Sequence, residues 1–361
     1  MEKESKVDFT SIRIVDAFAG IGGIRLGFET ASKTIGVDCI CAAAIEFDKN
    51  SRKTYAANFG HEPQFSDITK TDAALIPDHD ILVGGFPCQV FSRNGKFYNK
   101  NDRTLGDDDR KNLVTYLFEI LRVKNPSAFL FENVKEILTI RNSDGTMFFD
   151  TLVDNVRELG YCMKYAVLDA KDFGLPQQRR RVYMAGFRDE GSIDRFQFPT
   201  PNRITTCIRD ILQDKVDSKY EIEKLWSGRK NVRLPGMRID ALRKAYQDPR
   251  WEAARSARSP TMEISPVAIV YGDTPSGLPR QQDKLYSTWG VSPTIATFST
   301  PPVDVDGVWR LLTPRECARL QGLPEWFCLP RNDHLAYHQV GNGVAQNVVV
   351  AVSGKILEAI S

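Results

Sequence analysis

Residues 13–23 read RIVDAFAGIGG, and this stretch carries the main signal for the fold class. Its first half, Arg13–Phe18, is apolar enough to predict a buried strand, and the glycines predict a tight turn into a helix. Glycines at such a turn let the backbone approach a cofactor closely. The dinucleotide motif GxGxxG is not met, because Arg25 stands where its third glycine would be. Glu46 follows the next apolar run, where its carboxylate is placed to bind the ribose hydroxyls of a nucleotide-like cofactor. The two features fit a dinucleotide or S-adenosylmethionine, and a tight turn without a ligand is the alternative.

Working outward, short apolar runs alternate with helical patterns up to about residue 190. This alternation predicts an α/β domain with a parallel sheet and helices on both faces. The predicted strands are Arg13–Phe18, Cys41–Ile45, Asp80–Val83, Ala128–Phe131 and Arg181–Phe187, and the predicted helices include Asn112–Val123 and Met147–Leu159. In such sheets, ligands bind at the carboxyl ends of the strands. Residues that follow the strands are therefore expected to meet in one crevice.

The composition and the pattern of the sequence change after about residue 195. Proline, glycine, arginine and serine become frequent, which predicts a smaller, irregular second domain. Regularity returns with predicted helices over Thr313–Gln321 and Asn347–Ile360, and His338–Val344 is predicted to be a turn before the last helix. A length of 361 residues agrees with roughly two domains.

The composition is that of a globular protein, with 42% hydrophobic and 26% charged residues. No apolar stretch is expected to reach the roughly 18 residues of a membrane span, and the polar N-terminus predicts no secretory signal. The seven scattered cysteines predict a reducing, cytoplasmic environment, and the four histidines predict no metal site. Six of the cysteines, all but Cys88, are expected to be small buried side chains.

Positive charge gathers in the middle of the chain. Residues 195–300 carry 17 basic and 11 acidic side chains, whereas the rest carries 31 basic and 35 acidic ones. A basic segment on a slightly acidic chain indicates a surface for a polyanion, with a solvated face as an equally weighted alternative.

Three stretches carry candidate chemistry. Cys88, in the turn Gly84–Gln89, is presented at a strand end, where a thiolate suits nucleophilic attack, although a buried cysteine is the alternative. Glu132 follows a neighbouring strand, where a carboxyl group can donate a proton; its alternative is a capping or salt-bridged residue. The cations of Gln177–Arg181 suit a phosphate or a carbonyl, and a solvated loop is the alternative.

In this order, the stretches resemble the DNA (cytosine-5) methyltransferases, especially the single-chain bacterial enzymes of restriction-modification systems. The resemblance covers most of the chain except about residues 190–300. It rests on the family motifs DxFAGxGG at Asp16–Gly23, PCQ at Pro87–Gln89, ENV at Glu132–Val134, QxRxR at Gln177–Arg181, RECARLQGxP at Arg315–Pro324 and GN at Gly341–Asn342. Two departures are Arg180, where an acidic residue is common, and the continuation of the final motif as Gly343-Val344, where a serine often stands.

The resemblance implies a Rossmann-like, doubly wound methyltransferase domain with S-adenosylmethionine as the cofactor. It implies a catalytic domain over residues 1–190, completed by 331–361, and a target-recognition domain with its hinge over 191–330. Cys88 would attack carbon 6 of a flipped-out cytosine, Glu132 would protonate N3, and Arg181 would hold O2. Arg179 would support the flipped nucleotide, and Arg315 would support the recognition domain.

The resemblance also implies contacts to both partners. The implied cofactor residues are Phe18, Gly20, Gly22, Gly23, Glu46, Phe47, Asp67, Ile68, Pro87 and Asn342. The implied DNA contacts are Gln89 and Ser92, the latter in a mobile loop over Ser92–Lys100, together with Arg280, Gln281 and Thr294, which are weak candidates for base reading. Double-stranded DNA is the expected substrate of a monomer that works in the cytoplasm at the nucleoid, and a separate restriction endonuclease is an expected counterpart.

Three alternatives stay open from the sequence. A tRNA-methylating branch of the family shares the catalytic motifs. A Rossmann enzyme that uses NAD explains the glycines and Glu46, but not Cys88 with Glu132. A non-catalytic DNA-binding module explains the basic charge, but not an intact nucleophile and acid.

Overall fold

The computed structural model describes residues 11–87, 113–202, 204–224, 239–269, 284–297 and 300–361. The chain forms two compact units. Unit 1 comprises residues 1–168, 180–200 and 348–361, and unit 2 comprises residues 169–179 and 201–347. The sequence-based boundaries differ from these at residues 169–179, 191–200 and 331–347. Each unit is described by itself below.

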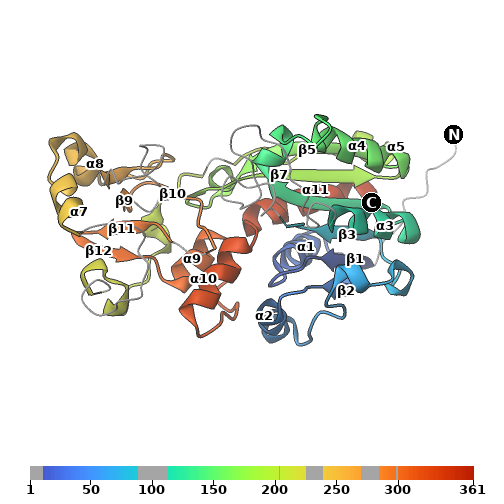
Figure 1. Cartoon of the computed structure of the whole chain (residues 1–361), viewed down its shortest axis with the longest axis horizontal. Coiled ribbons are helices and arrows are strands. Elements are labelled where there is room, and N and C mark those ends of the chain that lie inside the picture. Colours follow the sequence, from blue (N-terminus) through green and yellow to red (C-terminus); the bar gives the residue numbers. More distant parts are fainter. Residues whose placement is uncertain (1–10, 88–112, 203, 225–238, 270–283, 298–299) are drawn as a thin grey trace. The chain divides into compact units, whose positions relative to one another are not determined.

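Unit 1 is built on a six-stranded sheet in the order β2-β1-β3-β4-β7-β5 (Figure 1). Its strands are β1 (Ser11–Ala17), β2 (Asp38–Ile45), β3 (Ile81–Gly84), β4 (Ala128–Val134), β5 (Cys162–Asp169) and β7 (Arg180–Phe187). Strands β2, β1, β3 and β4 are parallel neighbours, so their carboxyl ends share one edge. The chain moves to opposite sides of β1 to place β2 and β3, which makes a topological switch point between β1 and β3.

The expectation of an all-parallel sheet is wrong at β7. This strand runs antiparallel to β4, with Val134 opposite Arg181 and Ala128 opposite Phe187. A buried apolar strand has the same composition in either direction, so the sequence did not reveal this pairing. The consequence is functional: the first residues of β7 lie beside the last residues of β4.

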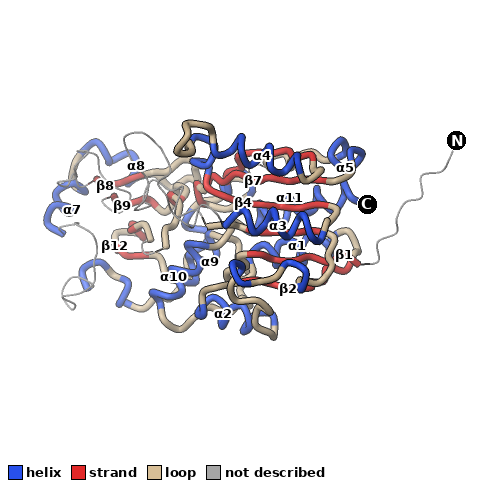
Figure 2. Tube along the Cα trace, turned by 45° about the vertical axis from the view of Figure 1, so that its right-hand side comes forward, coloured by secondary structure: helices blue, strands red, loops and turns tan. Residues whose placement is uncertain are grey.

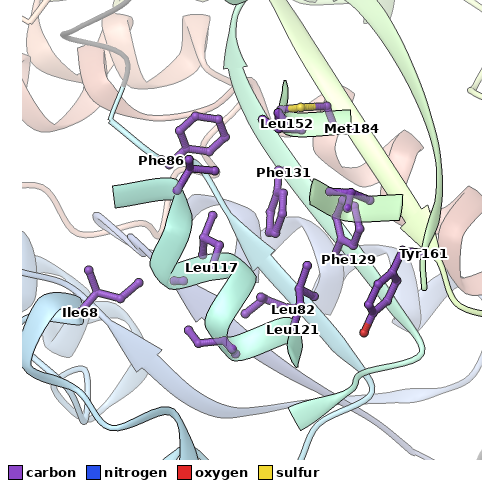
Figure 3. Packing of buried hydrophobic residues seen from close by; sticks show 14 of the residues in the cluster. Ile68, Leu82, Phe86, Leu117, Leu121, Phe129, Phe131, Leu152, Tyr161 and Met184 are labelled. Atoms are coloured by element: carbon purple, nitrogen blue, oxygen red, sulfur yellow. The ribbon is translucent and has the colours of Figure 1, made fainter. Parts of the chain in front are cut away.

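Helices cover both faces of the sheet, as predicted (Figure 2). The helices of unit 1 are α1 (Gly23–Thr34), α2 (Lys49–Phe59), α3 (Leu113–Lys124), α4 (Phe148–Glu158), α5 (Glu190–Arg195) and most of α11 (Gln346–Ile360), with short turns η1 (Ile68–Lys70), η2 (Ala73–Leu75) and η4 (Lys135–Thr139). Figure 3 shows Leu117 and Leu121 of α3 packed beside Leu82 and Phe131 of the sheet. On the other face, α1 and α11 meet so closely that a Cβ on Gly27 would lie 2.3 Å from Val349. This two-sided burial makes the sheet a rigid platform for residues at its edge.

The stretch Asp333–Ile360 is, among the described residues, the one long and apolar enough by composition to cross a membrane, although the sequence analysis expected none. It consists of two helices, α10 (Asp333–Asn342) and α11, separated at residues 343–345. Val349, Val352 and Ile356 of α11 are fully buried. Packing inside the protein therefore accounts for the apolar character of this stretch.

Unit 2 is more regular than the sequence predicted. It contains a four-stranded sheet in the order β12-β11-β9-β8 and a two-stranded pair, β10-β6. These strands are β6 (Gln177–Gln178), β8 (Pro266–Ile269), β9 (Lys284–Ser287), β10 (Ser292–Pro293), β11 (Pro302–Val305) and β12 (Val308–Leu311). Strands of two to four residues are too short for an alternation pattern, which is why the segment reads as irregular.

The helices of unit 2 are short. They are η5 (Ala170–Phe173), η6 (Ile208–Ile211), η7 (Ser218–Tyr220), α7 (Ile239–Tyr246), η8 (Pro249–Trp251), α8 (Glu252–Ser256), α9 (Pro314–Leu320) and α10. Helix α9 begins at a capping box in which Thr313 accepts from the Glu316 backbone and Glu316 accepts from the Thr313 backbone. The prediction of a turn over His338–Val344 is wrong for residues 338–342, which belong to α10.

Candidate active site

The loop between β1 and α1 has a backbone that ordinary residues adopt only with strain. Gly20 and Gly22 have φ of 56° and 87°, and Phe18, which is not a glycine, has φ of 57°. A left-handed conformation at a bulky residue costs energy and is concentrated at functional sites. The loop closes on itself where the Gly22 N–H donates to the Ala19 carbonyl at 2.7 Å. The glycines are therefore required by the shape of the loop.

Glu46 fixes this loop to the end of β2. Its Oε2 accepts a hydrogen bond from the Gly20 N–H at 2.7 Å, and its Oε1 accepts one from the Asp48 N–H at 2.6 Å. Burial raises the pKa of Glu46, and the two backbone donors offset only part of this rise. Each carboxylate oxygen has a second lone pair, so Glu46 can still accept from hydroxyl groups.

Two neighbours of Glu46 complete an edge suited to an aromatic base. Phe47 is 77% exposed, which is unusual for a phenylalanine and leaves its ring free to stack. Asp67 caps η1, and hydrogen bonds from the Thr69 side chain and backbone hold the pKa of its carboxyl group below its usual range. Ile68 is buried beneath it in the core cluster. Phe65 pairs with the end of β2, and this pairing brings Asp67 to the same edge as Glu46.

This set of residues fits the adenosine part of S-adenosylmethionine. Glu46 supplies acceptors for two ribose hydroxyls, Phe47 an exposed ring, and Asp67 an acceptor for an amine. A Cβ on Gly20 would meet nothing within 4 Å, so the loop has open space on that side.

The second part of the site lies where β3 and β4 end. Glu132 and Arg181 form an ion pair, with Arg181 Nε 3.2 Å from Glu132 Oε1. Arg181 pairs across the sheet with Val134, so it reaches Glu132 diagonally on the same face. A Cβ on Gly85 would lie 3.4 Å from Glu132 Oε2. The loop after β3 therefore runs directly past the carboxylate.

Asn133, which the sequence analysis did not select, holds that loop. Its Nδ2 donates to the Phe86 carbonyl at 3.1 Å, and its Oδ1 accepts from the Val134 N–H at 2.8 Å. Asn133 is fully buried, so the two bonds are the main interactions of a polar group inside the core. Phe86 and the half-buried Pro87 directly precede Cys88 in the chain. The position of Asn133 within the ENV motif was the signal that could have found it.

Asp16 is a second residue that the candidate site residues did not include. It lies on β1 just before the glycine loop, is buried, and has no hydrogen-bond partner among the described residues for either carboxylate oxygen. Burial raises the pKa of Asp16 to about 7, and the nearby backbone and guanidinium of Arg25 offset this only in part. A carboxyl group at the start of the DxFAGxGG motif, directly after the apolar residues Ile14 and Val15, was its signal.

Arg179 belongs to unit 2, although it stands only two residues before Arg181. Its Nη2 donates to the carbonyls of Gly341 at 3.1 Å and Gly343 at 2.6 Å, and its Nη1 contacts the Ile295 carbonyl at 3.4 Å. The side chain is buried. These contacts make Arg179 a brace for the loop that contains Gly341–Asn342. They favour a positioning role over direct contact with a reacting base.

Two further candidate residues lie in unit 2. Thr294 donates its hydroxyl to the Gln178 carbonyl at 2.6 Å, beside Arg179. Asn342 ends α10, with its Nδ2 3.5 Å from His338 Nε2. Their predicted contacts, to DNA and to the cofactor respectively, stay predictions. Arg315 is anchored within unit 2, where its Nη2 donates to the Phe327 carbonyl at 2.7 Å.

Five candidate residues fall outside the described part of the chain: Cys88, Gln89, Ser92, Arg280 and Gln281. The predicted mobile loop over residues 92–100 also falls there. Among the described cysteines, Cys207 and Cys317 are buried, whereas Cys162 and Cys328 are exposed, so the expectation of six buried cysteines is wrong for these two. No group of three potential metal ligands occurs among the described residues.

The fold and the residues at its carboxyl edge define the class of S-adenosylmethionine-dependent methyltransferases. A methyltransferase of Entamoeba histolytica, EhMeth, has a similar structure, with a TM-score of 0.69 at 16% identity over 97% of this chain and 99% of that chain. The Dnmt2 methyltransferase of S. pombe is also similar, with a TM-score of 0.65 at 17% identity over 96% of this chain and 98% of that chain. At such identities the likeness concerns the fold.

The sequence defines the family more narrowly. The family described as C-5 cytosine-specific DNA methylase matches residues 12–358, and the chain belongs to this family. Type II methyltransferase M1.ScrFI of Lactococcus lactis subsp. cremoris is 40% identical over 96% of this chain and 78% of its own length. Type II methyltransferase M.HhaI of Haemophilus parahaemolyticus is 33% identical over 96% of this chain and 94% of its own. The protein is thus an enzyme that methylates carbon 5 of cytosine in double-stranded DNA, with S-adenosylmethionine as the methyl donor.

Proposed function

We propose that Cys88, Glu132 and Arg181 carry out the reaction on a cytosine that has been flipped out of the duplex. The observation that supports this most is the Glu132–Arg181 ion pair at the ends of β4 and β7. Asn133 ties the same strand end to Phe86, two residues before Cys88. A nucleophile, an acid and a cation would then act on one ring. A base in the stack is out of reach of such a set, so flipping is required.

The chemistry divides one difficult substitution into easier steps. The Cys88 thiolate adds to carbon 6 while Glu132 gives a proton to N3, and Arg181 holds O2. The ring becomes an enamine, whose carbon 5 is nucleophilic enough to accept the methyl group that the cofactor supplies. The proton on carbon 5 then leaves, the thiolate is expelled from carbon 6, and N3 returns its proton to Glu132, which restores the aromatic ring as 5-methylcytosine.

Glu46 and Asp67 would receive the ribose hydroxyls and the adenine amine, and Phe47 would stack on the adenine. Phe18, Gly20, Gly22, Gly23, Ile68 and Pro87 would line the rest of the cofactor site, and Asn342 would close it. Arg179 would act through the Gly341–Gly343 backbone that it braces. Residues 1–190 and 331–361 would form the catalytic domain, and residues 191–330 the DNA-reading domain with its hinge.

The protein would act as the modification enzyme of a restriction-modification system, because both relatives above are named Type II methyltransferases. A cognate endonuclease would act separately on the same target sequence. A monomer suffices, because one cytosine on one strand is methylated at a time. The DNA contacts would come from Gln89, Ser92, Arg280, Gln281 and Thr294. The protein would work in the cytoplasm, at the nucleoid.

Base-resolution bisulfite sequencing tests this proposal. The gene is expressed in a strain without cytosine methylation, and protected cytosines in one short recurring sequence are expected. Cys88→Ser should abolish protection while purified protein still binds S-adenosylmethionine. Protection that survives Cys88→Ser would contradict the covalent mechanism. No protected DNA from a protein that binds the cofactor would contradict DNA as substrate and direct the assay to structured RNA.

A further inference from the structure

Arg25 stands where a dinucleotide motif would have its third glycine, and the structure gives this arginine a definite use. It lies in the first turn of α1 and reaches across to α2. Its Nη1 is 2.7 Å from the Tyr55 hydroxyl, and its Nε is 2.6 Å from Glu29 Oε1. The same Nη1 lies 3.1 Å from His61 Nε2. Because a guanidinium only donates, the hydroxyl and the imidazole nitrogen are the acceptors.

Phe59 lies between this guanidinium and the glycine loop. The Arg25 guanidinium carbon is 4.1 Å from the centre of the Phe59 ring, a cation–π distance. A Cβ on Gly22 would lie 2.2 Å from Cε2 of the same ring. The loop backbone, the Phe59 ring and the Arg25 side chain thus form three successive layers. Gly22 needs to be glycine both for its φ of 87° and for the approach of this ring.

The hydrogen bonds behind these layers run in one direction. Arg25 donates to the Tyr55 hydroxyl, and the Cys41 thiol donates to the Ala43 carbonyl at 3.3 Å. The Tyr55 proton is then left to point toward the Cys41 sulfur, 3.6 Å away. Tyr55 is fully buried, and burial strongly raises the pKa of its hydroxyl, which therefore stays protonated. This series of hydrogen bonds ends at Cys41 on β2, the strand that leads to Glu46.

From these contacts we infer that Arg25 and Phe59 are positioning residues for the cofactor. They hold the loop from behind, so that the Gly20 N–H and the Glu46 carboxylate keep the geometry that binds S-adenosylmethionine. Neither residue is required to touch the cofactor, and neither lies at the Glu132–Arg181 pair. The inference rests on the cofactor site of the proposed function.

Isothermal titration of the full-length protein with S-adenosylmethionine tests the inference. Arg25→Met and Phe59→Leu should each raise the Kd by about tenfold, because the loop loses its support. The KM for the cofactor should rise in parallel, whereas kcat at saturating cofactor should stay within about twofold. The Kd of Arg25→Lys should lie between those of wild type and Arg25→Met. Lysine keeps a cation near Phe59 but loses the forked guanidinium that reaches both Tyr55 and Glu29.

Arg157→Met is the matched control. Arg157 also pairs with a nearby carboxylate in unit 1, Asp154 at 3.1 Å, but it is 73% exposed on α4. This variant should bind the cofactor as wild type does. Affinity for target DNA and the midpoint of thermal unfolding are measured for all variants. A loss of DNA binding equal to the loss of cofactor binding would overturn the inference, because it would show a general loss of folded protein.

Further variants distinguish a failure of the inference from a failure of the proposed cofactor site. Wild-type affinity in both Arg25→Met and Phe59→Leu would overturn the inference and leave the cofactor site intact. Wild-type affinity in Glu46→Gln would instead contradict the proposed cofactor site itself. If Arg25→Met does not fold, Phe59→Leu decides the matter, because it keeps an apolar side chain while removing the ring that backs Gly22.

Discussion

A largely buried glutamate–arginine pair from each unit can be compared among the described residues, Arg310–Glu316 of unit 2 and Arg181–Glu132 of unit 1, and the two pairs are built differently. In unit 2, Arg310 contacts Glu316 through two bonds of 2.7 Å, and the backbone N–H groups of Thr313 and Gln213 donate to the same carboxylate. The two side chains are 6% and 0% exposed. In unit 1, Arg181 approaches Glu132 through Nε at 3.2 Å, and the side chains are 15% and 11% exposed.

The difference agrees with a structural role for Arg310–Glu316 and with the role in the reaction proposed for Glu132 and Arg181. Glu316 has its acceptor capacity filled and its charge neutralised, so it fixes the start of α9 to β12. Glu132 and Arg181 lie at a sheet edge and keep a small exposed surface there. A charged group that is to act on a substrate must stay accessible to it, whereas a charged group that stabilises the fold is best fully buried and paired.

Replacing Glu132 in the Glu132–Arg181 pair of unit 1 should have the largest effect, and this effect should be on activity. Glu132→Gln keeps the shape but cannot deliver a proton, so kcat should fall by about 10²–10⁴. The Kd for S-adenosylmethionine and the thermal midpoint should stay near their wild-type values. A stability loss as large as that of the next variant would erase the distinction between the two pairs.

Breaking the fully buried Arg310–Glu316 pair of unit 2 should lower the stability of the protein instead. Glu316→Gln leaves the Arg310 guanidinium buried without its counterion, which should lower the free energy of unfolding by about 3–5 kcal/mol. Denaturant titration measures the loss, and the kcat of the protein that remains folded should change little. A large drop in kcat without a loss of stability would assign Glu316 a part in the reaction.

Asp16 extends the comparison to a buried carboxyl group without an ion pair. Its pKa of about 7 in the folded protein exceeds the ordinary value of 3.8. Below about pH 4 the Asp16 carboxyl group is protonated in both the folded and the unfolded protein, so it does not lower the free energy of unfolding. As the pH rises to 7 the unfolded chain ionises first, so the fold loses stability, and the loss is complete above about pH 7.

Asp16→Asn removes this titration. The free energy of unfolding of the variant minus that of wild type should increase between pH 4 and pH 7, by about 2–4 kcal/mol, and then level off. Urea titrations over this pH range, without cofactor, measure the difference. A difference independent of pH would mean that Asp16 is not buried in the protonated form.

The smallest effect is expected for a pair with good geometry but little burial. Arg209 holds Asp306 through bonds of 3.0 and 2.6 Å, yet the side chains are 36% and 56% exposed. Asp306→Asn keeps a residue that tolerates the φ of 50° at this position, so mainly the charge is lost. Stability should fall by less than about 1 kcal/mol, and 1 M salt should shrink the difference. A loss near that of Glu316→Gln would show that burial is not what separates the pairs.

Most elements of unit 1 could be predicted from the sequence, although β5 and α2 were missed, as were Asp16 and Asn133 near the sheet edge. Predicted strands at Arg13–Phe18 and Ala128–Phe131 and a helix at Met147–Leu159 match β1, β4 and α4 within a few residues. Apolar periodicity and glycine turns are local signals, so they survive without knowledge of the fold. The ordered motifs identified the family for the same reason, because each is a short contiguous stretch.

The way in which these elements are used depends on contacts that form only in the folded protein. The antiparallel direction of β7 brings Arg181 to Glu132, and no local pattern encodes strand direction. Arg179 and Arg181 are only two residues apart, yet the chain passes from unit 2 to unit 1 between them. One therefore braces a loop, while the other faces the acid. The layers of Arg25, Phe59 and Gly22 likewise join residues more than 30 positions apart. Contacts of this range depend on packing, which a linear pattern does not record.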